Sequence, residues 1–158
     1  MFIRHLNDET KKYYGKPSMV LTMSGPSVSK QNHSDDDICK IFSAFYKDDR
    51  VEAIVISCGD MDPMDKQDEL RSFIFSARKF FEPDHRPIIT IYTNYYEDEL
   101  DAKGWSGIKC ELLYYGNILL KLGRPLPNDR KLYFNKALGI PLLGKYQDVY
   151  KYNKIQHM

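Results

Sequence analysis

Small and polar residues follow three apolar segments of this chain, at positions where the loops of a parallel sheet would bind a ligand. The candidate ligand-binding residues are Ser24, Gly25, Cys58, Gly59, Asp62, Thr93, Asn94 and Tyr95. Small residues let a backbone approach a ligand closely, although loops use the same residue types to make turns. Because ligands bind outside the carboxyl ends of parallel strands, the sequence predicts that these residues lie close together.

The same region contains carboxylates and a thiol whose chemistry needs to be considered. Asp60, Asp62 and Asp65 could attract a hard cation, but they lack the spacing and the glycine of an EF-hand loop. A solvated acidic loop is the preferred interpretation, and we predict no metal site. Cys58 has no histidine near it in sequence, and a buried cysteine behaves as a small hydrophobic residue. We therefore predict no catalytic residue.

Aromatic residues and arginines form a second set of candidates. The chain has 12 Tyr and 8 Phe but a single Trp, and tyrosine offers a large contact area with a polar tip. Arginine can bind a carboxylate or a phosphate through two hydrogen bonds. The predicted protein-interaction residues are Tyr96, Tyr114, Tyr115, Arg124 and Arg130. We expect the tyrosines to lie near the strand ends, with core packing as the alternative for about half of them.

Hydrophobic periodicity predicts the elements that position these residues. Continuous apolar runs predict buried strands at Ser18–Met23, Val51–Ser57 and Pro87–Tyr92, with further strands at Lys109–Leu113 and Asn117–Leu122. Helices are expected after Ser34, along the apolar face Leu70, Phe73, Ile74 and Ala77, and at Tyr95–Gly104. The segment after Gly123 is predicted to be rich in loops, and residues 151–158 to be a flexible tail.

Strands that alternate with helices indicate βαβ units with right-handed crossovers. The predicted fold class is therefore α/β, with a mainly parallel sheet flanked by helices in a single domain over residues 1–150. A chain of 158 residues can bury one substantial core.

Composition excludes several classes of function. A net charge of +1 gives no reason to expect a nucleic-acid or membrane partner, and no apolar run reaches the roughly 18 residues that span a bilayer. The cysteines Cys39, Cys58 and Cys110 are far apart, which argues against a disulfide framework and against zinc or cluster spacing. The polar, acidic start of the sequence is unlike a signal peptide, so a cytoplasmic location is expected. The oligomeric state stays open.

Five segments carry a resemblance to a known family: KPSMVLTM, DDDICKIFSAF, VEAIVIS, IYTNYYEDEL and NILLKLGRPLPNDRKLYFNKALGIPLLG. They resemble segments of the small radical S-adenosylmethionine activases, the activating components of anaerobic (class III) ribonucleotide reductase, and of their phage and clostridial iron–sulfur relatives. The resemblance covers Lys16 to Tyr150 and implies a partial (β/α) barrel. It also implies a site for S-adenosylmethionine, in which Gly59 and Asp62-Pro63 match the family's glycine-rich segment.

The chain departs from this family where the chemistry occurs. In the family, a CxxxCxxC loop after the first strand holds a [4Fe–4S] cluster. The equivalent loop here, Ser24–Asp35, contains Ser27, Ser29 and His33 but no cysteine. Serine hydroxyls and one imidazole cannot replace three thiolates, and without the cluster there is no electron source for reductive cleavage. The chain is therefore predicted not to be an enzyme.

Three functions follow from this comparison. The leading hypothesis is a catalytically inactive radical-S-adenosylmethionine-like pseudo-enzyme that has no cofactor and acts by binding a protein. A phage or mobile-element inhibitor of a host defence system, such as an anti-CRISPR protein, is one form it could take. The alternative is a small-molecule binder that keeps a pocket for S-adenosylmethionine or a nucleotide at the strand ends. The third is a ribonucleotide reductase activating enzyme with unconventional cluster ligands.

Overall fold

The structure is a computed structural model of the whole chain. It describes residues 14–23, 42–43, 45, 52–81 and 87–152, together with the backbone of residues 3–10. The loop Ser24–Asp35, with the candidate residues Ser24 and Gly25, lies outside the described residues. So does most of the helix predicted after Ser34, of which residues 42, 43 and 45 are described and helical.

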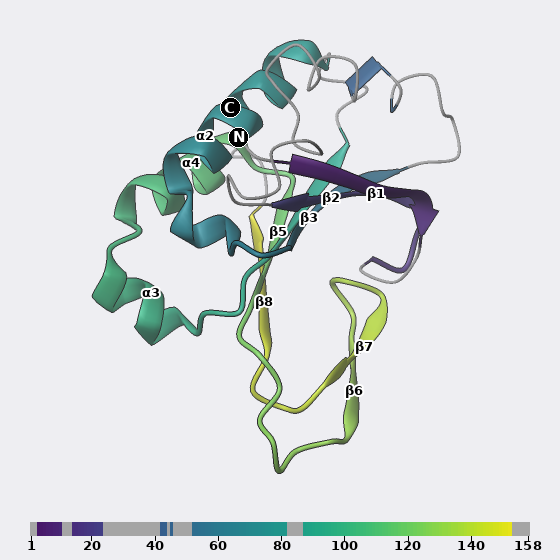
Figure 1. Cartoon of the computed structure of the whole chain (residues 1–158), viewed down its shortest axis with the longest axis vertical. Helices are drawn as coiled ribbons and strands as arrows, with labels where there is room; N and C mark the ends of the chain where they lie inside the picture. The colour runs from purple at the N-terminus through teal and green to yellow at the C-terminus, as the bar shows by residue number, and fades with distance from the viewer. Residues whose placement is uncertain are drawn as a thin grey trace, which may run out of the picture.

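A six-stranded sheet forms the centre of the fold, with its strands in the order β1-β2-β3-β4-β5-β8 (Figure 1). The strands are β1 (Ile3–Thr10), β2 (Ser18–Met23), β3 (Ala53–Cys58), β4 (Ile88–Tyr92), β5 (Ile118–Leu122) and β8 (Asp148–Tyr152). The inner strands β2 to β5 run parallel, and the outer strands β1 and β8 pair antiparallel with β2 and β5. The predicted α/β class with a mainly parallel sheet is confirmed.

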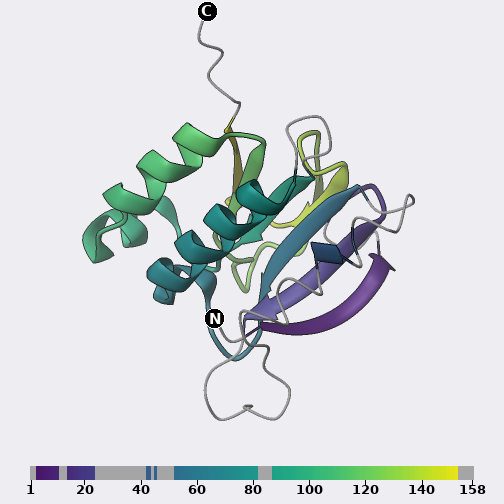
Figure 2. The same ribbon diagram turned by 90° about the horizontal axis from the view of Figure 1, so that it is seen from above.

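The helices between the inner strands lie on one face of this sheet. Helix α2 (Gln67–Phe80) connects β3 to β4 after the short 3-10 helix η2 (Pro63–Asp65), and α3 (Glu97–Lys103) and α4 (Ser106–Tyr115) connect β4 to β5. Because the parallel strands neighbour one another in chain order, right-handed crossovers place the connecting helices on the same side. Figure 2 shows α2 and α4 together there. None of the described helices is long and apolar enough to cross a membrane.

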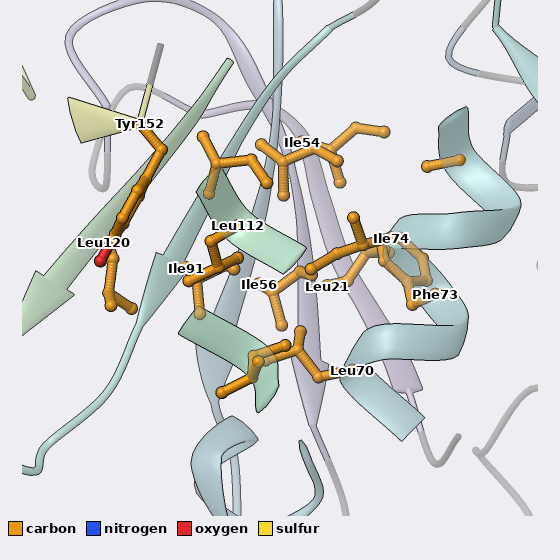
Figure 3. Packing of buried hydrophobic residues seen from close by; sticks show 14 of the residues in the cluster. Leu21, Ile54, Ile56, Leu70, Phe73, Ile74, Ile91, Leu112, Leu120 and Tyr152 are labelled. Carbon is orange, nitrogen blue, oxygen red and sulfur yellow. The ribbon is translucent and has the colours of Figure 1, made fainter. Parts of the chain in front are cut away.

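Both faces of the inner strands β2 to β5 are buried, and successive residues of a strand point to opposite sides. Under α2 and α4, strand residues that include Leu21, Ile56 and Ile91 pack against Phe73 and Ile74 (Figure 3). The predicted apolar face of α2 is confirmed, because Leu70, Phe73, Ile74 and Ala77 are all buried. On the opposite face, a second core contains Tyr14, Val20, Ala53, Val55, Leu119, Leu138 and Leu142.

The segment after Gly123 forms strands where loops were predicted. Strands β6 (Leu132–Asn135) and β7 (Ile140–Leu143) form a separate antiparallel hairpin, and β8 then returns to the main sheet. The hairpin residues Leu138 and Leu142 enter the second core, which fixes the hairpin against the sheet. Strand β8 extends to Tyr152, so residues 151 and 152 belong to the sheet and not to the predicted tail.

The strand predicted at Lys109–Leu113 is wrong, because these residues lie within α4. Neighbouring parallel strands need a crossover of about a dozen residues or more, and this helix is part of the crossover between β4 and β5. Ile108 and Leu112, one helical turn apart, are its buried residues. The apolar residues of the segment are compatible with a strand, but the connection requires a helix.

Candidate functional site

The loops after β3 and β4 meet at the carboxyl edge of the sheet, where the Asp62 carboxylate joins them. Asp62 accepts hydrogen bonds from the Thr93 hydroxyl (2.8 Å) and from the backbone N–H of Asn94 (2.8 Å). It also accepts from the backbone N–H of Met64 (3.0 Å) and from the Cys58 thiol (3.6 Å). The structure therefore brings four of the candidate ligand-binding residues together, and their polar groups bond to one another.

Gly59 is held against the end of β2. Its backbone N–H donates to the Met23 carbonyl oxygen (3.1 Å). A Cβ at position 59 would lie 2.4 Å from that oxygen and 2.4 Å from Cγ2 of Thr22. The contact between this loop and the strand thus requires glycine, independently of any ligand.

The Cys58 thiol is unsuited to nucleophilic attack. Burial, and after it the neighbouring Asp62 carboxylate, raise the pKa of this thiol to about 12, so the reactive thiolate is scarce at neutral pH. Cys110 is exposed on α4, and Cys39 lies outside the described residues. Within the part of the chain that the structure describes, no three His, Cys, Asp or Glu side chains gather in a way that could hold a metal ion.

Tyr95 links η2 to α3. Its hydroxyl donates to Asp65 (2.7 Å), and the Lys103 ammonium lies 2.8 Å from an oxygen of the same carboxylate. Partial burial opposes ionisation of Asp65, but the hydrogen bonds from Lys103 and Tyr95 outweigh it and lower the pKa of this carboxyl below its usual value. The hydroxyl of this candidate ligand-binding residue is thus used within the protein.

The predicted interaction residues Tyr96 and Arg124 contact each other. The Arg124 guanidinium lies 4.6 Å from the centroid of the Tyr96 ring. It donates to Glu99 (2.7 and 3.3 Å) and to the Asn94 carbonyl oxygen (2.8 Å). Arg130 is exposed, and no described carboxylate lies within ion-pair distance of it. Of the two arginines, Arg130 therefore has its guanidinium available.

The prediction that Tyr114 and Tyr115 lie near the carboxyl ends of the strands is wrong. Both residues end α4, which directly precedes β5, so they lie at the amino end of that strand. A crossover helix returns the chain to the start of the next parallel strand, and this geometry separates them from Tyr95 and Tyr96. The Tyr114 side chain is exposed, and Tyr115 packs partly against the first core.

Lys121 is a feature of this edge that the sequence analysis missed. It lies on β5 opposite Tyr92 of β4, is 5% exposed, and donates to the Gly123 carbonyl oxygen (2.6 Å). Burial lowers the pKa of this ammonium to about 8, although Cys58 and Asp62 favour its charged form. One lysine within the apolar run Ile118–Leu122 was the sequence signal that pointed to it.

Among the described residues, strand β6 carries the longest run of consecutive exposed large apolar side chains. The sequence analysis missed this feature too. Leu132 is 66% exposed, Tyr133 39% and Phe134 68%. In Figure 1 the hairpin lies at the lower edge of the molecule, away from α2 and α4. The sequence signal was three consecutive large apolar residues between Lys131 and Lys136, in a segment otherwise predicted to be loop.

An open groove of about 660 Å³ lies between α3 and the segment that follows β5. Its lining residues are Tyr96, Glu97, Asp98, Asp101, Leu122, Leu126, Tyr146 and Asp148. The groove is acidic, and part of its charge is used within the protein: Asp101 accepts a hydrogen bond from the Trp105 indole (2.8 Å), and Glu97 accepts one from the Tyr150 hydroxyl.

Comparison with known proteins leaves the fold and these contacts as the basis for assigning a function. No protein-family model, curated protein or solved structure matches this chain.

Proposed function

We propose that this chain is a non-catalytic domain that binds another protein through the β6–β7 hairpin. The observation that carries the proposal is the exposure of Leu132 and Phe134, which lie two positions apart and therefore share one face of β6. Isolated exposed apolar residues are common on protein surfaces, but neighbouring ones on one face mark an interaction site. A strand that leaves its large side chains in solvent loses the free energy of burying them unless a partner covers them.

The strand ends support this choice over a small-molecule pocket. Asp62 accepts four hydrogen bonds from neighbouring loop groups. The space beside Gly59 is occupied by the end of β2. A ligand that approached Asp62 would have to displace donors that already satisfy it. The pocket for S-adenosylmethionine or a nucleotide therefore stays a prediction, supported by the resemblance alone.

The scaffold that we propose for this binder is a radical-S-adenosylmethionine-like partial (β/α) barrel that has lost its cluster ligands. The chain-order sequence of the parallel strands β2 to β5 is consistent with such a barrel segment. Inhibition of a host defence system by a phage or mobile element is the biological setting that we propose, from the resemblance to phage relatives.

Affinity capture from cells of the source organism tests the proposal. The bait is the full chain, compared with a Leu132→Ser, Phe134→Ser double variant. The matched control is Phe75→Ser, which removes an exposed phenylalanine from α2 instead (48% exposed). We expect the wild-type chain and the control to enrich the same protein, and the double variant to recover at least about tenfold less. Equal recovery by the double variant would exclude the hairpin, and the absence of any specific protein would exclude protein binding.

A further inference from the structure

The outer edge of β6 presents backbone groups that no described strand pairs. β6 pairs with β7, and no other described strand pairs with it. The register sets Phe134 opposite Pro141; proline has no amide hydrogen, so this cannot be a hydrogen-bonded pair of the antiparallel ladder. The hydrogen bond from the Gly144 N–H to the Lys131 carbonyl oxygen (2.8 Å) agrees with this alternation. The backbone N–H and C=O groups of Leu132 and Phe134 therefore point to the open edge.

The same two residues present their side chains on one face of the strand. Leu132 and Phe134 are two positions apart, so their side chains share a face, and Tyr133 lies on the other. The two side chains that share a face are 66% and 68% exposed. Backbone donors and acceptors along an edge, flanked by apolar side chains on a face, are the features through which a sheet edge binds an added strand.

Positive charge is concentrated in the segment formed by this hairpin and the residues that flank it. The segment 123–147 contains five basic residues and one acidic residue, a net charge of +4, whereas the whole chain has a net charge of +1. The basic residues are Arg124, Arg130, Lys131, Lys136 and Lys145. Arg124 pairs with Glu99, but the other four form no ion pair with any described carboxylate. A partner segment that carries negative charge would therefore complement the hairpin.

Two other occupants fit this edge less well. A second copy of β6, added antiparallel with Leu132 opposite Phe134, would set Lys136 of each strand opposite Arg130 of the other, and like charges across a strand pair are destabilising. A single-stranded nucleic acid needs aromatic rings that stack successive bases. Tyr133 and Phe134 lie on opposite faces of the strand, so they cannot form one such surface.

We propose that the open edge of β6 binds an extended, acidic segment of a partner protein by strand addition. This inference rests on the proposed function, since it names the mode and the chemistry of the same binding surface. The partner strand bonds to the backbone groups of Leu132 and Phe134. Its apolar side chains pack on these two side chains, and its carboxylates lie on the opposite face, beside Lys131.

The test uses fluorescein-labelled synthetic peptides and the full chain, with binding read by fluorescence anisotropy. The probe is a capped peptide of alternating glutamate and valine, and the comparison probes are its lysine–valine counterpart and an oligothymidylate. Phe134→Ala removes the ring but keeps the backbone donor, whereas Phe134→Pro removes the donor as well. Proline is tolerated at a sheet edge where the N–H faces solvent, and an unchanged melting temperature checks that each variant folds.

We expect the glutamate–valine peptide to bind and the lysine–valine peptide not to bind. Phe134→Pro should weaken binding roughly 2- to 12-fold beyond Phe134→Ala, the range that one hydrogen bond contributes. N-methylation of alternate peptide amides should weaken binding to the wild-type chain by a similar factor, without any change in the protein.

Four results would overturn the inference. These are equal binding by the two Phe134 variants with no effect of N-methylation, preference for oligothymidylate, no binding of the acidic peptide, and concentration-dependent self-association that occupies the hairpin. If the first is found while the Leu132→Ser, Phe134→Ser variant still loses its captured protein, strand addition fails and the proposed function stands. If that variant keeps its captured protein, the proposed function itself fails.

Discussion

Burial of the Lys121 ammonium makes the free energy of unfolding depend on pH, and this dependence can be measured. The Lys121 side chain is 5% exposed, and burial lowers its pKa from 10.5 to about 8. Between these two values the unfolded chain binds more protons at this residue than the folded chain does. The free energy of unfolding therefore rises with pH through this window, and below pH 8 the folded state carries the full cost of the buried ammonium.

The size of the effect follows from the two pKa values. One pKa unit corresponds to about 1.4 kcal/mol. Because the folded state is still half protonated at pH 8, the rise from pH 7 to pH 9 adds about 1.4 kcal/mol, and the whole window about 3 kcal/mol. Cys58 acts in the opposite direction at higher pH. Its pKa is raised from 9.0 to about 12, so its contribution to stability is present below pH 9 and is lost as pH rises toward 12. Cys58 is present in both the wild-type chain and a Lys121 variant, so the difference between the two from pH 7 to pH 9 isolates the lysine.

The assay is urea unfolding of the wild-type chain and of Lys121→Met at pH 7 and pH 9. We expect the wild-type free energy of unfolding to rise by about 1.4 kcal/mol relative to the variant. At pH 7 the variant should be the more stable by about 1 to 2 kcal/mol, because loss of the hydrogen bond to the Gly123 carbonyl oxygen offsets part of the gain. Lys145→Met, at an exposed position, controls for removal of a lysine. Parallel changes in the wild-type chain and Lys121→Met would refute the reasoning.

Three further predictions concern the same edge of the sheet. Gly59→Ala should lower the free energy of unfolding, measured with urea, by about 2 to 4 kcal/mol, because its Cβ would lie 2.4 Å from a backbone carbonyl oxygen of β2. Gly107→Ala is the control: its Cβ would lie 3.5 Å from the nearest atom, on the Arg71 side chain, so it should raise the free energy of unfolding by about 0.5 kcal/mol. Asp62→Asn should cost about 1 to 3 kcal/mol in the same assay, because an amide cannot accept from all four donors, and an unchanged midpoint would show that the carboxylate does not join the two loops. Iodoacetamide at pH 8 should modify exposed Cys110 before half-buried Cys58, as followed by mass spectrometry; the reverse order would contradict the raised pKa of the Cys58 thiol.

The central strands could be predicted because strands that are buried on both faces consist of continuous apolar residues. Strand β2 is Ser18–Met23 as predicted, and β3, β4 and β5 each lie within two residues of their predicted bounds. All six residues of β2 and all five of β5 are buried, and a strand buried on both faces is a continuous apolar run. The helix α4 could not be recognised in this way, because its apolar residues match a strand as well as a helix over so short a segment.

The candidate site was predictable only as a neighbourhood. Strand order and direction bring Cys58 and Thr93 to one edge, and the sequence indicated both. Which side chains form hydrogen bonds there depends on the conformation of the loops, and the pattern of residues does not predict that conformation. Asp62 and Thr93, for example, are hydrogen-bonded although they are 31 residues apart. The hairpin was missed because β6 has no buried face along its length, and periodicity detects a strand through the residues that it buries.

The order of the strands gives a reason for proposing a binding site on the β6–β7 hairpin and not at the carboxyl ends of β2 to β5. In doubly wound sheets a crevice forms where successive crossovers leave in opposite directions. Here β2 to β5 follow chain order and their helices share one face, so these strands have no such crevice. A ligand site would then depend on loops held open above the strand ends, and Asp62 instead draws the loops after β3 and β4 together. Strand β6 has no such constraint, because the hairpin packs on the second core through Leu138 and Leu142, with Ala137 and Ile140 against it, and none of these residues lies on β6. Strand β6 can therefore take on side chains suited to a partner at little cost to the fold.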